Sequence, residues 1–313
     1  MRIRPLAAAS IAALSVAVLA GCTASDTEAD PTSTGDAAGD LCAAAVASGS
    51  VSDSLTVEGE VGEASTLSFD APLEVEELQR TVVVEGSGDP VSDGDLVSYA
   101  LTVYSAETGD EIGSFGYDDS TALPQQITAD NPLGQLFGCA TPGTRVVAAF
   151  PASDDGAAAE VYILDLLSVV PAAAWGEPQE PVAGMPTVEL DESGAPTITI
   201  PDEEPPTDVE IAELKVGGGE VVAEGDSVMV QYTGVKWSDG TVFDSSWDRG
   251  APTSFSTSGV VAGFSQALVG QTVGSQVLVV IPPEFGYGAS DGHELQDETI
   301  VFVVDILGTQ HAA

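Results

Sequence analysis

The sequence predicts an α+β protein built from two copies of one fold, each an antiparallel β-sheet packed on a single short helix. Three observations lead to this prediction. Short runs rich in valine, isoleucine and threonine alternate with Gly, Pro and Asp turns along most of the chain. Each copy has one segment with the three- and four-residue apolar spacing of a helix. The chain also matches itself at a constant offset.

Length and composition limit the possible functions. A chain of 313 residues suggests two domains, and its 43% hydrophobic content is sufficient for packed cores. The 50 acidic residues far outnumber the 7 basic ones. Nucleic acid needs a basic surface for its phosphates, so it is not expected as a partner. We interpret the acidity as a source of solubility through self-repulsion, with a specific cation-binding role as the alternative.

The N-terminal segment predicts export. Residues 1–21 have the layout of a secretory signal, with two arginines, an apolar run and then small residues. The ending Leu19-Ala20-Gly21-Cys22 resembles the lipobox of bacterial lipoproteins, which implies cleavage before Cys22 and a lipid on its sulfur. An ordinary signal followed by a chance cysteine is the alternative. We therefore expect the chain at the extracytoplasmic face of the bacterial cell membrane, anchored by this lipid.

Two further cysteines are expected to form one disulfide. Besides Cys22 the chain contains only Cys42 and Cys139, and an exported setting permits a bridge between them. Such a bridge closes a long loop and contributes about 2–4 kcal/mol to stability. The cysteine spacing fits no metal site, and His293 and His311 are the only histidines. The sequence therefore predicts no metal and no cofactor.

An internal repeat is visible along most of the chain. Matched positions lie 131 residues apart: GQLFGCATPGTRVVAAFP (134–151), for example, lies on SQALVGQTVGSQVLVVIP (265–282). The offset then becomes 140, where VYILDLL (161–167) lies on VFVVDIL (301–307). The first copy has therefore lost about nine residues before its last strand. Ordered matches at one offset over this length predict two copies of one fold.

The repeat and the composition together divide the chain. Residues 22–40 are rich in Ser, Thr, Ala, Gly and Asp and lack a periodic apolar pattern, which is typical of a flexible tether. A Pro- and Gly-rich stretch separates the two copies. The predicted parts are a signal peptide at 1–21, an acidic tether at 22–40, a first domain at 41–170, a linker at 171–184, a second domain at 185–309 and a tail at 310–313.

In the second copy, a hairpin at 230–250 is the most informative stretch. Asp-Gly at 239–240 lies between two β-prone runs and is a strong hairpin signal. The hairpin places Tyr232, Phe243 and Asp244 on two neighbouring strands. Two aromatic residues and one acid are therefore expected close together.

The remainder of the second copy supplies a helix and two strands. Apolar residues recur at spacings of three and four over residues 260–270, and Gly270 fits the end of a helix. Residues 277–281 and 300–306 are predicted as buried or half-buried strands. An antiparallel sheet packed on the helix follows from this order of elements.

The motifs of the second copy, taken together, resemble those of a known enzyme family. VQYTG, DGTVFDSS, GFSQALVGQTVG, IPPEFGYG and TIVFVVDIL follow one another over residues 216–307. Their order and spacing resemble those of the FKBP-type peptidyl-prolyl cis–trans isomerases. The chain as a whole resembles an actinobacterial secreted lipoprotein with two FKBP-like domains. The resemblance implies a half-open sheet curled around the helix, with an apolar pocket for a prolyl ring between them.

The same resemblance implies the site residues. Phe264 would form the floor under the prolyl ring, and the Val261 backbone N–H and the Tyr287 hydroxyl would hold carbonyls of the bound peptide. Asp244 would sit beside the twisting amide, hydrogen-bonded to Tyr232. The complete implied pocket consists of Tyr232, Phe243, Asp244, Phe255, Val260, Val261, Phe264, Tyr287 and Phe302.

These residue types suit the rotation of an amide bond. An X–Pro bond isomerises in tens to hundreds of seconds without a catalyst. The twisted amide is less dipolar than the planar one, so a dry apolar pocket disfavours the planar ground state more. No nucleophile, metal or cofactor is needed. Asp244 serves as a fixed partial charge and hydrogen-bond acceptor.

The second copy also departs from the family pattern. Thr253 stands where members usually carry an aromatic residue, and Phe264 stands where many have tryptophan. The loop at 288–298 is acidic and lacks the usual Ile-Pro-Pro tip, part of which His293 and Leu295 are expected to occupy. These differences predict a weaker or differently selective pocket.

In the first copy the site residues are replaced by apolar or small ones. At the 131-residue offset, Tyr232 becomes Leu101, Phe243 becomes Ile112, Asp244 becomes Gly113 and Phe264 becomes Leu133. The segment that carries Tyr287 is among the deleted residues. Apolar replacements preserve a core, so the first copy is predicted to fold without isomerase chemistry.

Two functions follow from these patterns. The first is a lipid-anchored, monomeric prolyl isomerase that acts on proline-containing exported polypeptides and binds no nucleic acid. The alternative is a peptide- or protein-binding chaperone module whose isomerase activity is vestigial. Retention of Tyr232, Asp244 and Tyr287 favours the enzyme, whereas Thr253 and the altered loop favour the binding module.

Overall fold

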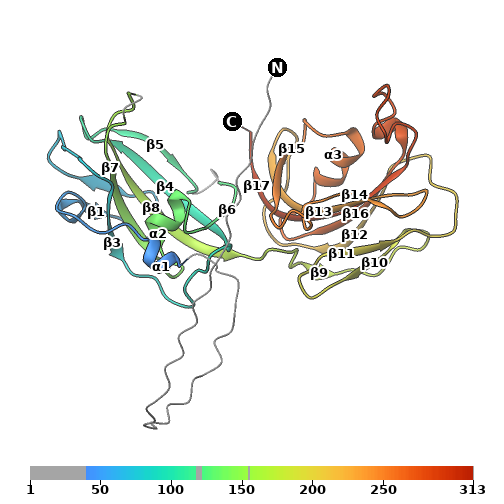
Figure 1. Cartoon of the computed structure of the whole chain (residues 1–313), viewed down its shortest axis with the longest axis horizontal. Coiled ribbons are helices and arrows are strands. Elements are labelled where there is room, and N and C mark those ends of the chain that lie inside the picture. The colour runs from blue at the N-terminus through green and yellow to red at the C-terminus, as the bar shows by residue number, and fades with distance from the viewer. Residues whose placement is uncertain (1–39, 118–121, 154–155, 313) are drawn as a thin grey trace, which may run out of the picture. The chain divides into compact units, whose positions relative to one another are not determined.

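A computed structural model describes residues 40–117, 122–153 and 156–312. The predicted signal peptide, Cys22 and nearly all of the predicted tether lie outside these described residues. Within them, no helix is long and apolar enough to cross a membrane. Two antiparallel sheets make up most of the described chain, with only short helices (Figure 1).

The first sheet has six antiparallel strands. Its order is β3-β7-β8-β4-β5, and β6 pairs with the free edge of β4. The helix α2 (Pro132–Phe137) begins at Asn131, whose side chain accepts a hydrogen bond from the Gly134 N–H. The strands are β3 (Gln79–Val84), β4 (Leu96–Ser105), β5 (Glu111–Phe115), β6 (Gln125–Gln126), β7 (Arg145–Phe150) and β8 (Glu160–Val170).

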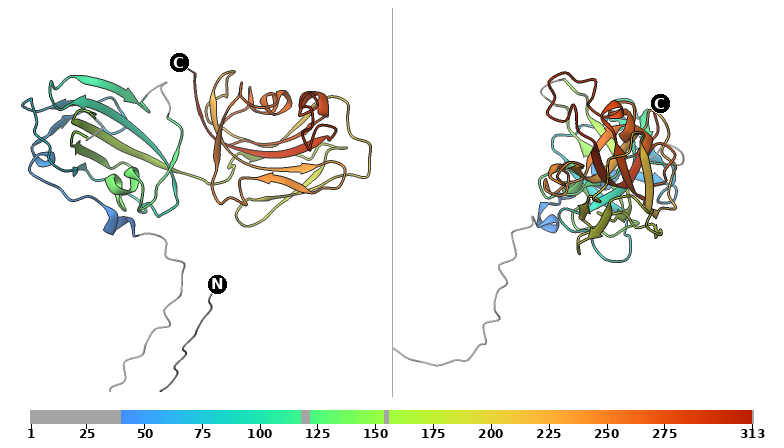
Figure 2. Two further views of the ribbon diagram at one scale, coloured as in Figure 1. Left: turned by 45° about the horizontal axis from the view of Figure 1, so that its top comes forward. Right: turned by 90° about the vertical axis from the view of Figure 1, so that its right-hand side faces the viewer.

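The second sheet has seven antiparallel strands in the order β14-β13-β17-β16-β12-β9, and β15 pairs with β13. The helix α3 (Ala262–Leu268) lies against this sheet in both views (Figures 1 and 2). The predicted helix at 260–270 is therefore present but shorter. The strands are β9 (Glu177–Pro178), β12 (Glu210–Val216), β13 (Ser227–Lys236), β14 (Val242–Ser245), β15 (Thr253–Ser256), β16 (Gln276–Ile281) and β17 (Ile300–Gln310).

The 131-residue offset predicted from sequence recurs in the strand pairing. The bulge in β13 between Met229 and Val230 has its counterpart in β4 between Ser98 and Tyr99. The irregularities in β12 against β16 and in β3 against β7 are related by the same offset. Bulges arise from local backbone irregularity and are not required by a sheet in general. Their coincidence shows that the two sheets share register as well as strand order.

A hairpin covers the face of each sheet opposite its helix. The hairpin β1 (Thr56–Glu58) with β2 (Thr66–Ser68) packs against the first sheet through Val57 and Leu67. The hairpin β10 (Thr187–Leu190) with β11 (Pro196–Thr199) packs against the second through Val188 and Ile198. These hairpins are also 131 residues apart. Each sheet is therefore buried on both faces, with one core facing the helix and one facing the hairpin.

More helical turns are present than the single short helix expected for each copy. In the first part, α1 (Leu41–Ala44) is capped by Asp40, whose carboxylate accepts a hydrogen bond from the Ala43 N–H. A 3₁₀ turn (Ser52–Ser54) follows α1, and another (Pro283–Phe285) precedes the site loop of the second part. Such pieces are too short to show a helical period in the sequence.

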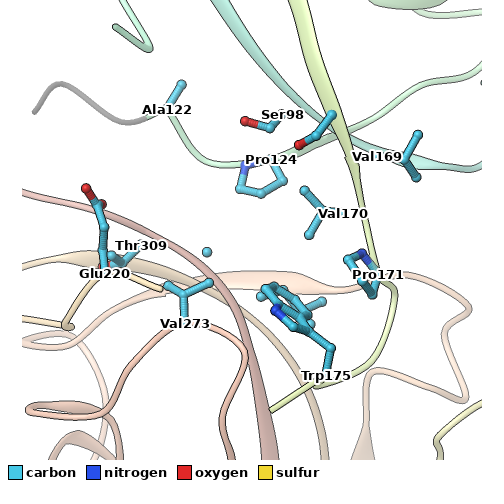
Figure 3. Close-up of a pocket in the computed structure, with 13 residues that line it drawn as sticks. Ser98, Ala122, Pro124, Val169, Val170, Pro171, Trp175, Glu220, Val273 and Thr309 are labelled. Carbon is cyan, nitrogen blue, oxygen red and sulfur yellow. The ribbon is translucent and has the colours of Figure 1, made fainter. Parts of the chain in front are cut away.

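The predicted linker at 171–184 is partly built into the second sheet. The Ala174 N–H donates to the buried Asp305 carboxylate at 2.8 Å, and β9 pairs with β12. Trp175 projects from the segment that follows Pro171 (Figure 3), and a Cβ added at Gly274 would come within 2.9 Å of its ring. Composition predicted a Pro- and Gly-rich linker here, and a buried acceptor holds part of its backbone in place.

A disulfide joins Cys42 to Cys139, with their Cα atoms 4.7 Å apart. This bond connects Cys42 in α1 to Cys139, the second residue after the end of α2. The same two cysteines were paired from the sequence. It links segments that are 97 residues apart in the chain.

Candidate active site

The strands of the second sheet place the site residues by their register. On β13, Gly234 pairs with Asp244 of β14 on one side and with Phe302 of β17 on the other. A Cβ at Gly234 would lie 2.6 Å from the Phe302 ring and 2.7 Å from the Phe243 ring. Glycine is therefore required here, because both rings pack directly over the backbone.

All nine residues implied by the family motifs line one pocket of about 300 Å³. Gly259 completes its lining. Residues from β13, β14, β15, β17, the start of α3 and the loop after β16 all contribute. The pocket is therefore assembled from segments spread over residues 232–302.

An aromatic cluster forms the interior of this pocket. Phe264 is buried and meets Phe302 at a centroid distance of 5.0 Å, Phe255 at 5.8 Å and Tyr232 at 6.2 Å, all edge to face. Phe243 also packs edge to face on Phe302, at 5.4 Å. Such contacts add to the stability of the cluster beyond the burial of area. Phe264 thus lies at the centre of a rigid apolar floor.

The single acid of the pocket belongs to a three-residue polar group. The Tyr232 hydroxyl donates to Asp244, as expected. Arg249, which the motif comparison did not select, donates to Asp244 through Nη1 and to the Tyr232 hydroxyl at 2.8 Å through Nη2. Its guanidinium also lies 5.4 Å from the centre of the Tyr232 ring. In the sequence, the feature that could have indicated this role is the position of Arg249 five residues after Asp244, in the turn WDRG.

The electrostatics of this group favour a protonated tyrosine. Burial raises the pKa of Tyr232 to about 12, assisted by its hydrogen bond to Asp244, while Arg249 opposes the shift. Tyr232 therefore remains a donor throughout the physiological range. Asp244 accepts from both neighbours and is a fixed acceptor, which fits electrostatic stabilisation better than proton transfer.

Tyr287 enters the pocket from the loop that follows β16. Its ring stacks on that of His293 at 4.2 Å with an interplanar angle of 4°. The His293 ring nitrogen Nδ1 accepts a hydrogen bond from the Leu295 N–H at 3.1 Å, and Leu295 is buried in the helix-side core. The altered loop therefore still fixes Tyr287, through a histidine stack and a leucine anchor.

Val261 lies immediately before α3, in extended conformation. Its carbonyl accepts hydrogen bonds from the Phe264 and Ser265 N–H groups, both at 3.0 Å. The described residues contain no recorded acceptor for its own N–H. A ligand carbonyl in the pocket can therefore take that position.

The corresponding positions of the first sheet differ in exposure as well as in identity. Ile112, at the position of Phe243, is 58% exposed. Tyr162, at the position of Phe302, packs on Phe150 at 4.9 Å and donates its hydroxyl to Glu160 at 2.6 Å. At the positions that match Tyr232, Phe243, Asp244 and Phe264 the first sheet therefore carries no aromatic residue and no acid.

Within the described chain, no group of three or more His, Cys, Asp or Glu side chains is placed to hold a metal ion. The chemistry that the pocket can supply comes from apolar walls, two tyrosine hydroxyls, one paired carboxylate and a backbone N–H. This set can bind and desolvate an amide.

Comparison with known proteins gives one consistent result. The family model for FKBP-type peptidyl-prolyl cis-trans isomerase matches residues 218–307. A probable FK506-binding protein of Corynebacterium glutamicum is 39% identical over 113 residues, which cover 36% of this chain and 96% of that protein. An FK506-binding protein of Streptomyces anulatus is 37% identical over 117 residues, covering 36% of this chain and 94% of that protein.

Among solved structures, the crystal structure of FkpA from Escherichia coli aligns with 29% identity and a TM-score of 0.33, covering 42% of this chain and 54% of that one. The sequence matches with FK506-binding proteins span nearly the whole length of those relatives. The chain therefore belongs to the FKBP-type peptidyl-prolyl cis–trans isomerase family and is an enzyme of that class.

Proposed function

We propose that this isomerase acts on X–Pro bonds of exported polypeptides and binds the prolyl ring in the pocket over Phe264. The observation that carries the proposal is the gathering of all nine expected residues around one hollow of about 300 Å³. A prolyl ring is compact and apolar, and the aromatic floor matches it in both respects.

The proposed mechanism uses binding and desolvation without a covalent intermediate. The Val261 N–H and the Tyr287 hydroxyl hold carbonyls on either side of the proline. The aromatic walls exclude water, which disfavours the dipolar planar amide relative to the twisted one. Asp244, held by Tyr232 and Arg249, presents a fixed partial negative charge to the rotating amide.

The first sheet is proposed to be a second FKBP-like domain that has lost this chemistry. Shared strand order, bulges and covering hairpins at one offset support common ancestry of the two sheets. The changes Tyr232 to Leu101 and Asp244 to Gly113 remove the polar group, and no residue stands in place of Tyr287.

The enzyme is proposed to work as a monomer at the extracytoplasmic face of the cell membrane, anchored by a lipid on Cys22. The signal-like segment and lipobox support this location. A disulfide between Cys42 and Cys139 fits an oxidising compartment. Intact mass of the membrane-extracted protein tests it, with Cys22→Ala as the control: no mass difference beyond the substitution would refute lipidation.

The decisive experiment is an isomerisation assay of the mature chain on a short peptide containing Leu-Pro. Catalysis above the spontaneous rate, inhibited by FK506 (the ligand named in both relatives), supports the proposal. Peptide binding without acceleration would instead support the alternative, a peptide-binding chaperone module with vestigial catalysis.

A further inference from the structure

We propose that the outer edge of β3 in the first sheet binds an extended, apolar and non-acidic polypeptide segment as an added strand. The ligand class rests on the proposed function, because it is the unfolded chain that the prolyl pocket also meets. The binding surface is separate from that pocket and makes no use of its residues. It gives the first sheet a role in holding the polypeptide.

The edge combines exposed apolar side chains with free backbone. β3 is the terminal strand of its sheet and, among the described strands, pairs with β7; the Arg80 N–H donates to the Ala47 carbonyl at 3.2 Å on the outer side, so the open edge begins at Val82. Val82, Val83 and Val84 are 40%, 40% and 39% exposed. In the described residues, no backbone hydrogen bond is recorded on the outer side of these three valines. Exposed edges usually carry charges or proline that block pairing, and residues 82–84 carry neither, with Arg80 and Glu85 flanking them and a strand irregularity at Val83.

The second sheet shows how such an edge is covered. At the 131-residue offset, the three valines correspond to Glu213, Leu214 and Lys215 of β12. There β9 pairs with Lys215 and Val216, and the Gln179 N–H donates to the Leu214 carbonyl at 2.9 Å. The covered edge is charged, whereas the uncovered edge is apolar. This reversal indicates that the β3 edge has a partner of its own.

A hollow beside the edge provides room for side chains. It has a volume of about 410 Å³, and its lining includes Val82, Phe137, Ala140 and the disulfide-bonded Cys42 and Cys139, together with the charged Arg80 and Glu85. An added strand directs alternate side chains to one face of the sheet. One or two apolar residues of the bound segment can therefore enter this hollow.

Charge and composition select the occupant. Residues 23–40 of this chain contain no valine, isoleucine, leucine or aromatic residue, so the tether has nothing to fill an apolar hollow. A second copy of the chain would bring together two molecules with a formal charge of −43 each. An apolar segment without acidic residues avoids both difficulties.

The test uses a fluorescein-labelled octapeptide of alternating valine and threonine with a lysine at each end. It contains no proline, so the prolyl pocket has no ligand to bind. We expect the mature chain to raise its fluorescence anisotropy and hydrogen exchange to slow at residues 82–85. Val82→Thr should weaken binding about fourfold, the equivalent of about 0.8 kcal/mol for one buried methyl group.

Two further variants make the test specific. Val83 has no partner residue in β7, so proline at this position breaks no pairing between β3 and β7. Val83→Pro removes one backbone N–H from the edge and should abolish binding. Ile211→Thr changes a 40% exposed residue on the covered strand β12 and should have no effect. A peptide with glutamate at each end should bind more weakly.

Several outcomes would overturn the proposal. These are no binding by the wild type, equal binding by Val82→Thr, equal binding of the glutamate peptide, or a dimer that Val83→Pro dissociates. Isomerisation of a Leu-Pro peptide is measured on the same samples. Octapeptide binding without catalysis would contradict the proposed function alone, and catalysis without octapeptide binding would contradict this inference alone.

Discussion

The helix-side faces of the two sheets share a frame but differ in almost every residue that contacts the pocket. Tyr232 and Leu101 occupy the same register position in the two sheets. Tyr232 of β13 pairs with Val304 of β17, and Leu101 of β4 pairs with Leu164 of β8. One face carries an aromatic pocket with a paired carboxylate; the other has an exposed isoleucine and a glycine at the matching positions. The frame therefore folds without the pocket residues, which implies that their presence in the second sheet serves binding and catalysis.

The two sheets also differ in the partners of one buried aspartate that both contain. Asp165 of β8 and Asp305 of β17 are both buried at the same register. Asp165 forms an ion pair with Arg145, whose Nη atoms also donate to the Gly59 and Glu60 carbonyls of the covering hairpin. Asp305 instead accepts from Gln276 and from the Ala174 N–H. In each sheet one buried acid therefore helps to hold a segment outside the sheet: the loop of the covering hairpin in the first, and the linker at Ala174 in the second.

The largest effect on activity is expected when the helix-side face of the second sheet is converted into that of the first. The triple variant Tyr232→Leu, Phe243→Ile, Asp244→Gly should lower kcat/KM for a Leu-Pro peptide by about 100-fold, because it removes the polar group and part of the aromatic wall. Circular dichroism should remain that of a folded β protein. The control adds the reverse changes Leu101→Tyr, Ile112→Phe and Gly113→Asp to the triple variant, which already lacks the second pocket. Isomerase activity in that chain would contradict the comparison, because three residues alone would then restore a site in the first sheet.

The largest effect on stability is expected from the loss of the buried ion pair. Arg145→Ala leaves Asp165 uncompensated and should destabilise the first sheet by about 3–5 kcal/mol. Gln276→Ala at the matched position should cost the second sheet about 1–2 kcal/mol, since it removes one hydrogen bond.

Spectroscopy separates these two effects. All three tryptophans, Trp175, Trp237 and Trp247, lie in the part that builds the second sheet. Arg145→Ala should therefore shift the unfolding transition seen by circular dichroism and leave the tryptophan transition in place. A matching shift in tryptophan fluorescence would show that the two sheets unfold as one unit.

Removal of the disulfide tests a constraint found only in the first sheet. Cys42→Ala with Cys139→Ala should lower the stability of that sheet by about 2–4 kcal/mol, because the bond closes a long loop in the unfolded chain. Isomerase activity should stay unchanged. Thiol titration of the wild-type protein provides the control, and two free thiols would rule out the bridge.

The smallest effect concerns Asp226, a buried acid that accepts more hydrogen bonds than its counterpart Asp95 in the first part. Burial acts to raise the pKa of Asp226, but hydrogen bonds from the Ala223 N–H, His311 and Thr309 outweigh it and hold the pKa below its ordinary value. Its counterpart Asp95 keeps only the bond from the Ser92 N–H among these. A lowered pKa stabilises the folded state above the ordinary value near 3.9, and this stabilisation is lost as pH falls through the folded value.

Asp226→Asn should therefore cost about 1–2 kcal/mol at pH 6 and progressively less towards pH 2. Tryptophan fluorescence in denaturant measures this difference. Asp95→Asn is the matched control and should show a smaller effect, detected by circular dichroism. A penalty for Asp226→Asn that is independent of pH would show that the charge of the carboxylate is not responsible.

Much of the site was predictable because ordered motifs carry both spacing and residue type. The 131-residue offset located the two copies, and the motifs named nine residues that line one pocket. Arg249 was missed because a single arginine in a turn has no periodic signal. The covering hairpins were also missed, although Thr56-Val57-Glu58 and Thr187-Val188-Glu189 are identical at that same offset.

The β-rich repeat, the pocket residues and the loss of those residues from the first copy could all be predicted from the amino-acid sequence, because they depend on local pattern and on residue identity. Tertiary structure alone decided which groups meet across the chain. The hydrogen bond from Ala174 to Asp305, the hydrogen bond from Arg145 to the Gly59 carbonyl and the uncovered edge at residues 82–84 all depend on long-range contacts. Such contacts are set by the packing of whole sheets, so they cannot be predicted from any single stretch of sequence.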